Sequence, residues 1–432
     1  MRRRTTDGSI QRCLAVALAV SIAGFAVERP RAAAEPQLSA TATFSPARLQ
    51  RVGDFIRQEI AAGKMPGAII LIQQYGRPVY FESFGVRDLE SRHPMTADTI
   101  FRVFSMSKPI TSVAAMMLVE DGKLALDDPV AKYIPAFADT KVGNEKIDEN
   151  GKPVLVQEPL QRSITIKDLL RHTSGITYGF YGDGAVRKLY AQSNLFSGDF
   201  DNATFAERIA KLPLAEQPGT RWDYGHSTDV LGRVIEVISG QTLYEFEKQR
   251  LLGPLGMTDT AFFVADPAQR PRIAQPMPHD GFDRPLAGIK DPTLPRRWES
   301  GGAGMVGTIA DYARFAQMLL NGGRLDGRRY LKPETISLMA SDHIGPETNI
   351  ARDQFYFPGA TSGFGLGFAV RTSVPANTSW PLGEFRWDGL AGTLFFIDPR
   401  DDMFAIFMIQ APALSGRIQL RLKTLIYEAL GN

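Results

Sequence analysis

The sequence predicts an α+β fold, in which a mainly antiparallel sheet is built from both ends of the chain with flanking helices. Strand-like runs occur near the start and again after residue 360, whereas helical patterns dominate the middle. Hairpin-length connections between the strands make neighbouring strands antiparallel. We therefore expect a sheet domain of residues 35–125 and 296–432, and a mostly helical insertion domain of residues 126–295.

The N-terminal part of the sheet domain has clear element boundaries. Ser45 is a typical N-cap, Pro46 fits the first helical turn, and Gly63 ends the apolar face that follows. The expected elements are that helix, a hairpin of strands Ala68–Gln73 and Pro78–Phe84 that turns at residues 75–77, and a helix over Ser105–Glu120.

The middle of the chain is expected to contain a polar hairpin around Asn150-Gly151 and several helices. The predicted helices there are Ile166–Arg171, Thr204–Leu212, Asp229–Ile238 and Leu243–Leu251. The C-terminal part begins with a helix near Ile309–Asn321 and ends with one over Ile418–Leu430. Its predicted strands are Gly365–Arg371, Glu384–Trp387, Gly392–Ile397 and Met403–Ile409.

Residues 1–34 have the features of a secretory signal peptide. A basic start precedes an apolar stretch over Leu14–Val27, and three alanines follow at residues 32–34. The alternative, a membrane anchor, needs about 20 apolar residues, and this stretch is shorter. We expect a periplasmic or secreted protein without stable membrane insertion once the leader is cleaved.

The composition excludes several classes of partner and cofactor. The chain has 432 residues, 44% hydrophobic and 22% charged, and its formal net charge is +2. This balance is typical of a globular protein and does not predict nucleic-acid binding. The single cysteine, Cys13, lies in the leader, and the five histidines show no metal-ligand spacing. We therefore expect no cofactor and no metal.

Ser105 and Lys108 are the first candidates for catalysis. Residues three apart on a helix lie on one face, and a serine at a helix N-terminus lies where backbone N–H groups favour negative charge. A lysine acts as a base only when it is partly neutral, which burial promotes. By itself, however, this spacing more often marks a solvated helix face.

The surrounding residues resemble the serine β-lactamase and penicillin-binding-protein superfamily. The segment from Asp98 to Thr111 (DTIFRVFSMSKPIT) is similar to its nucleophile region, and the likeness covers roughly residues 45–430. The chain looks most like family VIII carboxylesterases and class C β-lactamases. Further matches, in order, are DLLRHTSGI (168–176), WDYGHSTDVLG (222–232), GPLGMTD (253–259), GGAGMV (301–306) and WDG (387–389).

The resemblance implies a role for each matching residue. Ser105 would attack a carbonyl carbon and form an acyl-enzyme, with Lys108 and Tyr224 as the proton-transfer pair. Which of these two is the base stays open, because such a pair titrates as a coupled system. The backbone N–H groups of Ser105 and Leu390 would form the oxyanion hole.

The segment Trp387-Asp388-Gly389 stands where the family usually has Lys-Thr-Gly. A β-lactam or peptide terminus brings a carboxylate that needs a cation, but Trp387 is neutral and Asp388 repels it. Arg386 should point away by strand alternation. Gly389 would let the strand approach the acyl group. We therefore predict an exported carboxylesterase that cleaves small or short-chain esters.

Other assignments remain open at this stage. His226 would either hydrogen-bond to the substrate or fill space, Tyr178 would line the pocket, and His172 would hold a loop. A Ser-His-Asp triad is not expected, because the chain has no Gly-x-Ser-x-Gly motif. The alternative functions are a β-lactamase, D-alanyl carboxypeptidase or D-aminopeptidase acting on amides, and a sensor that is acylated without turnover. The sequence does not predict the oligomeric state.

Overall fold

The computed structural model describes residues 43–196, 199–277, 291–352, 357–376, 378–411 and 415–431, with backbone alone at 415–417. The predicted signal peptide lies outside these residues. Among them, no helix is long and apolar enough to cross a membrane.

Strands from both chain ends form one antiparallel seven-stranded sheet, as predicted. Its order is β11-β12-β13-β14-β15-β1-β2, so the two ends meet where β15 pairs with β1 (Ile70 opposite Phe407). The strands are β1 (Gly67–Gln74), β2 (Arg77–Gly85), β11 (Ser362–Phe364), β12 (Ala369–Arg371), β13 (Phe385–Asp388), β14 (Leu394–Asp398) and β15 (Met403–Met408). The α+β class is confirmed.

Local signals set the first element boundaries. The Ser45 side chain accepts a hydrogen bond from the Arg48 backbone N–H and begins helix α1 (Pro46–Ala61). The β1–β2 turn places Tyr75 and Gly76 at φ 51° and 71°. This left-handed pair matches the twist of a two-residue hairpin turn.

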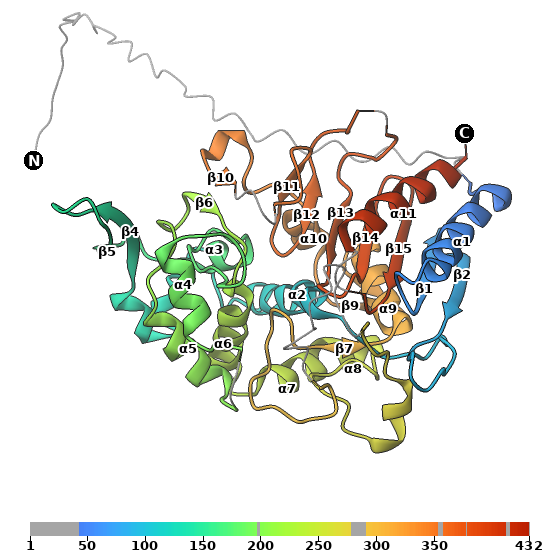
Figure 1. The fold of residues 1–432 in the computed structure, drawn as a ribbon, viewed down its shortest axis with the longest axis horizontal. Helices are drawn as coiled ribbons and strands as arrows, with labels where there is room; N and C mark the ends of the chain where they lie inside the picture. The colour runs from blue at the N-terminus through green and yellow to red at the C-terminus, as the bar shows by residue number, and fades with distance from the viewer. Residues whose placement is uncertain are drawn as a thin grey trace, which may run out of the picture. The chain divides into compact units, whose positions relative to one another are not determined.

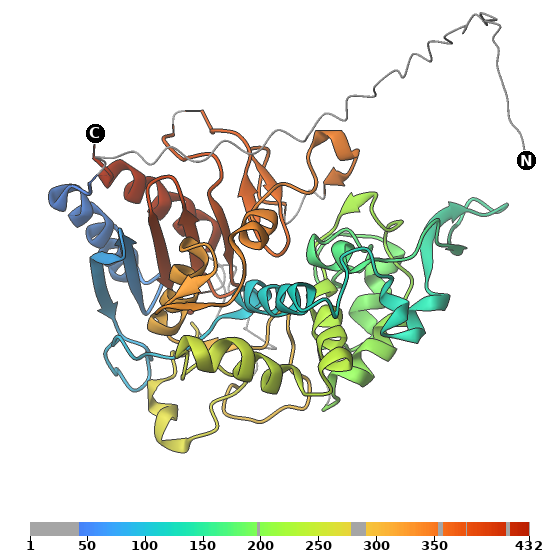
Figure 2. The same ribbon diagram turned by 180° about the vertical axis from the view of Figure 1, so that it is seen from behind.

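Helices cover both faces of the sheet (Figures 1 and 2). Helices α1 and α11 (Ser415–Ala429) pack against each other, and their apolar residues share one cluster with one face of the sheet. Helix α9 (Ile309–Leu320) contacts β1, β14 and β15, and its apolar residues belong to the larger cluster. Helix α2 (Ser107–Glu120) belongs to that cluster as well, and twelve of its residues are buried.

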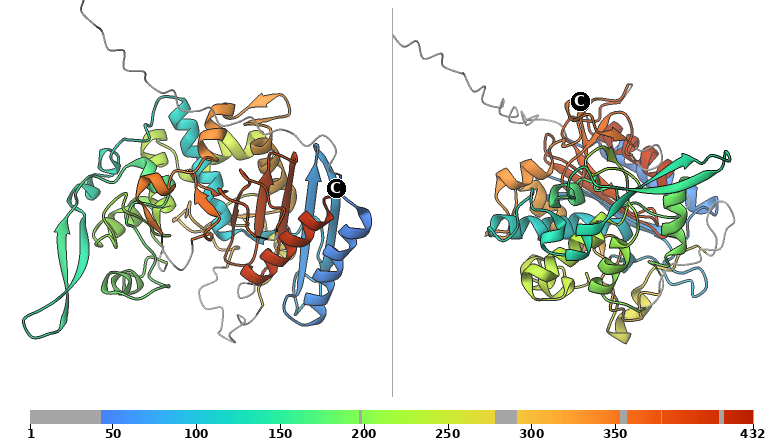
Figure 3. Two further views of the ribbon diagram at one scale, coloured as in Figure 1. Left: turned by 90° about the horizontal axis from the view of Figure 1, so that it is seen from above. Right: turned by 90° about the vertical axis from the view of Figure 1, so that its left-hand side faces the viewer.

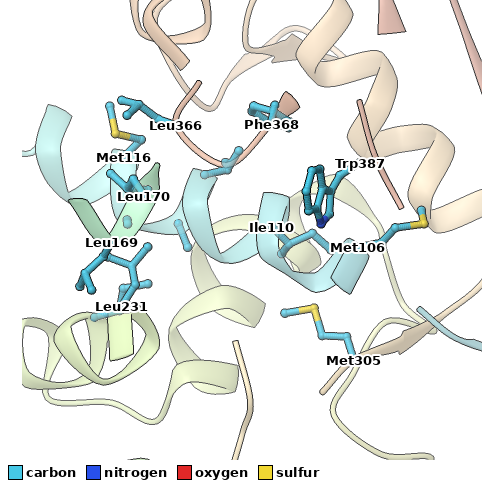
Figure 4. Packing of buried hydrophobic residues seen from close by; sticks show 14 of the residues in the cluster. Met106, Ile110, Met116, Leu169, Leu170, Leu231, Met305, Leu366, Phe368 and Trp387 are labelled. Carbon is cyan, nitrogen blue, oxygen red and sulfur yellow. The ribbon is translucent and has the colours of Figure 1, made fainter. Parts of the chain in front are cut away.

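Helix α2 joins the sheet region to the helical region, because it also packs against α6 (Ser227–Ser239). Figure 4 shows Met106, Ile110, Met305 and Trp387 around its first turns, and Met116 with leucines of α3 (Ile166–Leu170) and α6 near its end. A helix buried along nearly its whole length is held in place by both regions, so its first turn is a rigid position for a catalytic group.

The helical region contains the elements that were predicted and two helices that were not, Ala185–Gln192 and Gly253–Leu255. Its helices are α3 (Ile166–Leu170), α4 (Ala185–Gln192), α5 (Asn202–Ala210), α6, α7 (Leu243–Glu247), which continues into a π-helical turn (Lys248–Leu252), and α8 (Gly253–Leu255). The polar hairpin forms β4 (Lys141–Ile147) and β5 (Pro153–Pro159), and it extends beyond the neighbouring helices (Figure 3). The domain boundaries at residues 126 and 295 stay a prediction.

The remaining elements are short. They are the strands β3 (Phe101–Arg102), β6 (Arg221–Trp222), β7 (Val306–Gly307), β8 (Arg324–Leu325), β9 (Arg328–Arg329) and β10 (Ala351–Arg352), the helix α10 (Pro333–Met339), and single 3₁₀ turns at Phe104–Met106, Val130–Lys132, Pro135–Asp139, Pro267–Arg272 and Pro346–Thr348.

The predicted strand Gly365–Arg371 is wrong in one respect. The chain bends at residues 365–368 and forms two paired strands, β11 and β12. A Cβ at Gly365 would lie 2.0 Å from the Met339 carbonyl oxygen, and Gly367 has φ 99°. These glycines provide the close approach and the left-handed conformation that a turn needs.

Candidate active site

Ser105 lies in a 3₁₀ turn (Phe104–Met106) directly before α2, two residues outside the α-helix in which it was predicted. Phe104 has a left-handed φ of 45°, an unfavourable conformation for a phenylalanine. The turn is held from both sides, because the Val103 backbone N–H donates to Met305 O at 3.0 Å and the Met305 N–H donates to Ser107 Oγ at 3.1 Å. Pro109 fits because the first-turn N–H groups of a helix need no partner within it.

Lys108 is buried, with 2% of its surface exposed, and its Nζ is the centre of the site. Nζ lies 3.2 Å from Ser105 Oγ, 3.2 Å from Tyr178 Oη and 2.7 Å from the Gly302 carbonyl oxygen. Burial lowers the pKa of Lys108 to about 7, although the negative charges of Asp229 and Asp388 oppose this shift. Much of the amine is therefore neutral near neutral pH.

The contacts of Nζ determine where its lone pair points. A neutral amine has two N–H groups and one lone pair, and the Gly302 carbonyl can only accept a hydrogen bond. When the second N–H is donated to the Tyr178 oxygen, the lone pair is left for the Ser105 hydroxyl. In this arrangement Lys108 can take the proton of Ser105.

Tyr224 lies beside this pair, as the resemblance implied. Its ring centroid is 4.6 Å from Lys108 Nζ, and its hydroxyl accepts a hydrogen bond of 3.3 Å from the Trp387 indole. The preceding residue, Asp223, is buried and accepts two hydrogen bonds of 3.0 Å from Arg187. The Ser105 hydroxyl and the Tyr224 ring therefore both lie beside Lys108 Nζ, and proton transfer through the Tyr224 hydroxyl stays a prediction.

The structure adds a reason for Gly389, whose approach to the acyl group stays a prediction. A Cβ there would lie 2.4 Å from the Val103 carbonyl oxygen, so only glycine lets the end of β13 approach the chain two residues before Ser105. Its N–H is donated to Thr393 O at 2.8 Å. Leu390 follows in the turn, with its side chain 51% exposed. Within the described chain, neither the Leu390 nor the Ser105 N–H donates a hydrogen bond, which fits an oxyanion hole.

Trp387 lies beside Tyr224, with 5.3 Å between the ring centroids, and it is buried. Its neighbour Arg386 donates to Pro358 O at 3.2 Å and to Ser362 Oγ at 3.5 Å, toward β11. Arg386 thus bonds away from the catalytic residues, as strand alternation predicted. Burial raises the pKa of Asp388 above its ordinary value, although the charges of Arg386 and Lys108 oppose this shift.

His226 belongs to a buried network that ends at Lys108. Its Nδ1 lies 2.8 Å from Asp229 Oδ2, and Asp229 Oδ1 accepts hydrogen bonds from the Gly302 N–H at 3.1 Å and from the Ser300 hydroxyl. Burial raises the pKa of Asp229, but the hydrogen bonds from His226 and Ser300 and the charges of His226 and Lys108 together outweigh it, so that the pKa lies below its ordinary value. The network holds the peptide whose carbonyl binds Lys108. Contact of His226 with a substrate stays a prediction.

His172 has contacts that suit a role in holding its loop. Its carbonyl oxygen accepts a hydrogen bond of 2.9 Å from the Asp223 N–H, and its ring centroid is 4.9 Å from that of Tyr224. Burial lowers the pKa of His172 well below its usual range. Among the described residues, no group of three or more His, Cys, Asp or Glu side chains is arranged to hold a metal ion.

Glu247 of α7 was not predicted, and it lies behind the Gly301–Gly302 peptide. Thr111 Oγ1 is 3.0 Å from both Glu247 Oε1 and the Gly301 carbonyl oxygen, yet a hydroxyl has only one proton to donate. When that proton goes to Gly301 O, the carboxyl must donate to Thr111, so it is protonated. Burial indeed raises the pKa of Glu247 well above its usual range.

Two further site features were only partly visible in the sequence. Tyr178 was predicted as a pocket residue, but its hydroxyl binds Lys108 directly. The motif GGAGMV was recognised without a role, and the structure shows that its second glycine supplies the carbonyl that binds Nζ. A hydrogen bond donated to a backbone carbonyl carries no side-chain signature, so no residue type could indicate it.

The fold and the cluster of Ser105, Lys108, Tyr178 and Tyr224 are those of an active-site serine enzyme in which a buried amine, and not an imidazole, lies beside the serine. The family described as Beta-lactamase matches residues 52–426, and the chain belongs to this family. It is a serine hydrolase of the β-lactamase fold.

Several relatives are similar over most of their length. Protein Rv1367c of Mycobacterium tuberculosis is 37% identical over 371 residues, covering 83% of this chain and 90% of that protein. Esterase EstB of Burkholderia gladioli is 31% identical over 410 residues (88% and 95%), and a lovastatin esterase of Penicillium rubens is 31% identical over 375 residues (82% and 90%). Among solved structures, EstCE1, a hydrolase with promiscuous acyltransferase activity, is 27% identical with a TM-score of 0.72, covering 89% of this chain and 99% of that one.

The pH dependence of kcat/KM should follow the ionisation of the Lys108 amine. The amine accepts the Ser105 proton only in its neutral form, and its pKa is about 7. Ester hydrolysis should therefore fall about tenfold for each pH unit below ~7 and level off above it. Initial rates between pH 5 and 9, with folding checked by circular dichroism, measure this, and a flat profile over pH 5 to 8 would contradict it.

Replacement of Tyr178 by Phe should lower kcat about tenfold with little change in KM. The ring remains, but one hydrogen bond to Lys108 Nζ is lost, and a bond of this kind is worth about 1 to 1.5 kcal/mol. Steady-state kinetics on one ester test this. The matched control is Tyr133→Phe, whose hydroxyl bonds to Asp128 instead. Unchanged kcat in Tyr178→Phe would show that this phenol does not orient the amine.

Replacement of Glu247 by Gln should stabilise the protein relative to wild type as the pH rises. In the folded wild-type protein Glu247 keeps a proton that the unfolded chain releases above about pH 4.3. The unfolding free energy of the wild type therefore falls by up to ~1.4 kcal/mol per pH unit above that value, whereas the glutamine of the variant has no proton to release. Urea unfolding at pH 5 and 7.5 measures the difference between the two proteins. Glu245→Gln, on the exposed face of the same helix, is the control. An equal difference at both pH values would mean that Glu247 is ionised.

Proposed function

We propose that this protein is an exported carboxylesterase that hydrolyses small or short-chain neutral carboxylic esters through an acyl-enzyme on Ser105. The observation that carries the proposal is the 3.2 Å contact between Ser105 Oγ and a buried amine whose pKa is about 7. A serine hydroxyl is a weak nucleophile unless a base takes its proton, and Lys108 is that base at neutral pH.

Each step of the reaction has a residue to perform it. Ser105 Oγ attacks the ester carbonyl carbon while its proton passes to Lys108, and the oxyanion receives hydrogen bonds from the Ser105 and Leu390 N–H groups. The C–O bond breaks as the Lys108–Tyr224 pair returns the proton to the leaving alkoxide. Water then attacks the acyl-enzyme, gives its proton to the same pair, and releases the acid as Ser105 is reprotonated.

The charges of the residues beside Tyr224 favour a substrate without a carboxylate. Trp387 carries no charge, and the nearby cation Arg386 bonds toward β11. Lys108 already binds three partners, so it is not available to a substrate carboxylate. Relatives named as esterases over most of their length, from Burkholderia gladioli and Penicillium rubens, support the same class. Export rests on the signal-peptide features of residues 1–34.

The test compares an ester with an amide-type substrate. We expect a higher kcat/KM for p-nitrophenyl butyrate than for a chromogenic cephalosporin, and no turnover of either by Ser105→Ala. A higher value for the cephalosporin would instead favour the alternative β-lactamase or peptidase functions. Stoichiometric acylation without steady-state product would point to a sensor.

The variant Trp387→Lys tests whether the residue at position 387 selects against substrates with a carboxylate. It should raise the relative rate for an anionic ester, such as a monoester of succinate, over its neutral counterpart. Trp387→Phe is the matched control, because it loses the indole bond to Tyr224 without gaining a charge. An equal ratio in the two variants would contradict the proposal that this position selects against carboxylates.

A further inference from the structure

Three aromatic rings lead outward from Lys108 and form what we call the aromatic shelf, defined as Tyr178, Phe180 and Phe196. The ring centroids of Tyr178 and Phe180 are 4.7 Å apart with their planes at 28°, and those of Tyr178 and Phe196 are 6.0 Å apart at 29°. Phe180 and Phe196 are also 6.0 Å apart. The rings of the shelf are thus stacked on Tyr178, whose hydroxyl binds the catalytic amine.

The inner and outer rings of the shelf differ sharply in exposure. Tyr178 is 4% exposed, whereas Phe180 is 56% and Phe196 is 45% exposed. Large exposed apolar side chains that gather in one place often mark a ligand-binding surface, because their contact with water is unfavourable. Here they are continuous with the catalytic residues, which identifies the ligand as part of the substrate.

The distances match the size of an ester. The centroid of the Tyr178 ring is 5.7 Å from Lys108 Nζ, and Phe180 lies one stacking distance farther out. A group that rests on Phe180 and Phe196 is therefore separated from the ester carbonyl by a linker of only a few atoms. Behind the shelf, His226 and Trp298 place further rings 4.8 Å and 6.1 Å from Phe196, so this wall is aromatic throughout.

We propose that the aromatic shelf is a subsite for an aromatic ring, so that the substrates are arylalkyl esters with one short half and one half that ends in an arene. This rests on the proposed esterase function and narrows its substrate class. The rings of Phe180 and Phe196 lie at 28° and 29° to Tyr178 and at 49° to each other, so an arene can stack on either exposed ring. Such stacking favours an arene over an alkyl group of equal size, because it adds to the burial of apolar surface.

The experiment compares an arene with a saturated ring of equal reach. One ester pair varies the acyl half (methyl 3-phenylpropanoate and methyl 3-cyclohexylpropanoate), and a second varies the alcohol half (3-phenylpropyl and 3-cyclohexylpropyl acetate). For the half that the shelf binds, we expect wild-type kcat/KM to favour the phenyl ester by about fivefold. The ratio should fall toward one in Phe180→Leu and Phe196→Leu, which keep apolar contact but lose the ring.

The matched control is Phe81→Leu, because Phe81 is 49% exposed on β2, the edge strand at the opposite end of the sheet order from β11. This variant should keep the wild-type ratio. If wild type hydrolyses methyl butyrate but shows no phenyl preference in either pair, or if the preference survives both shelf variants, the shelf proposal is wrong while the esterase function stands. If wild type hydrolyses none of these esters, the proposed function itself fails.

Discussion

The chemistry of this protein depends on keeping one amine out of water. Lys108 is almost fully buried, and the loss of hydration brings its pKa to about 7, where an exposed lysine would stay charged. Burial alone would lower the pKa of Lys108 without orienting its N–H groups or its lone pair. The Gly302 carbonyl and the Tyr178 hydroxyl bind Nζ from two sides and orient it toward Ser105.

Polar side chains hold two segments beside the amine in place. Asp229 binds the Gly302 N–H, and Thr111 lies between the Gly301 carbonyl and Glu247, whose pKa burial raises well above its usual range. The segment before Tyr224 is fixed by the buried pair of Asp223 and Arg187. Removing one partner of such a pair leaves an uncompensated charge, so these contacts restrict the site to a single arrangement.

Much of the fold and the catalytic set could be predicted from the sequence. Periodicity and turn residues located the strands at both chain ends, because burial on a sheet face leaves a pattern of its own. The glycine-rich segment after β11 was read as one strand, because glycines that permit a bend look the same as glycines within a strand. Helix α4 and the carboxyl of Glu247 were missed, since neither stands in a recognised motif.

The sequence by itself determined the order of the strands along the chain, because strands leave a local pattern of residue types. Through the resemblance of its motifs to a known family it also predicted Ser105 as the nucleophile, with Lys108 and Tyr224 as candidate bases. Only the tertiary structure decided that Ser105 precedes its helix in a 3₁₀ turn, that Tyr178 binds the amine, and that the outer rings of the shelf are left in contact with solvent. Hydrogen bonds to backbone carbonyls and the depth at which a charge is buried arise from contacts between distant segments, and spacing along the chain does not encode them.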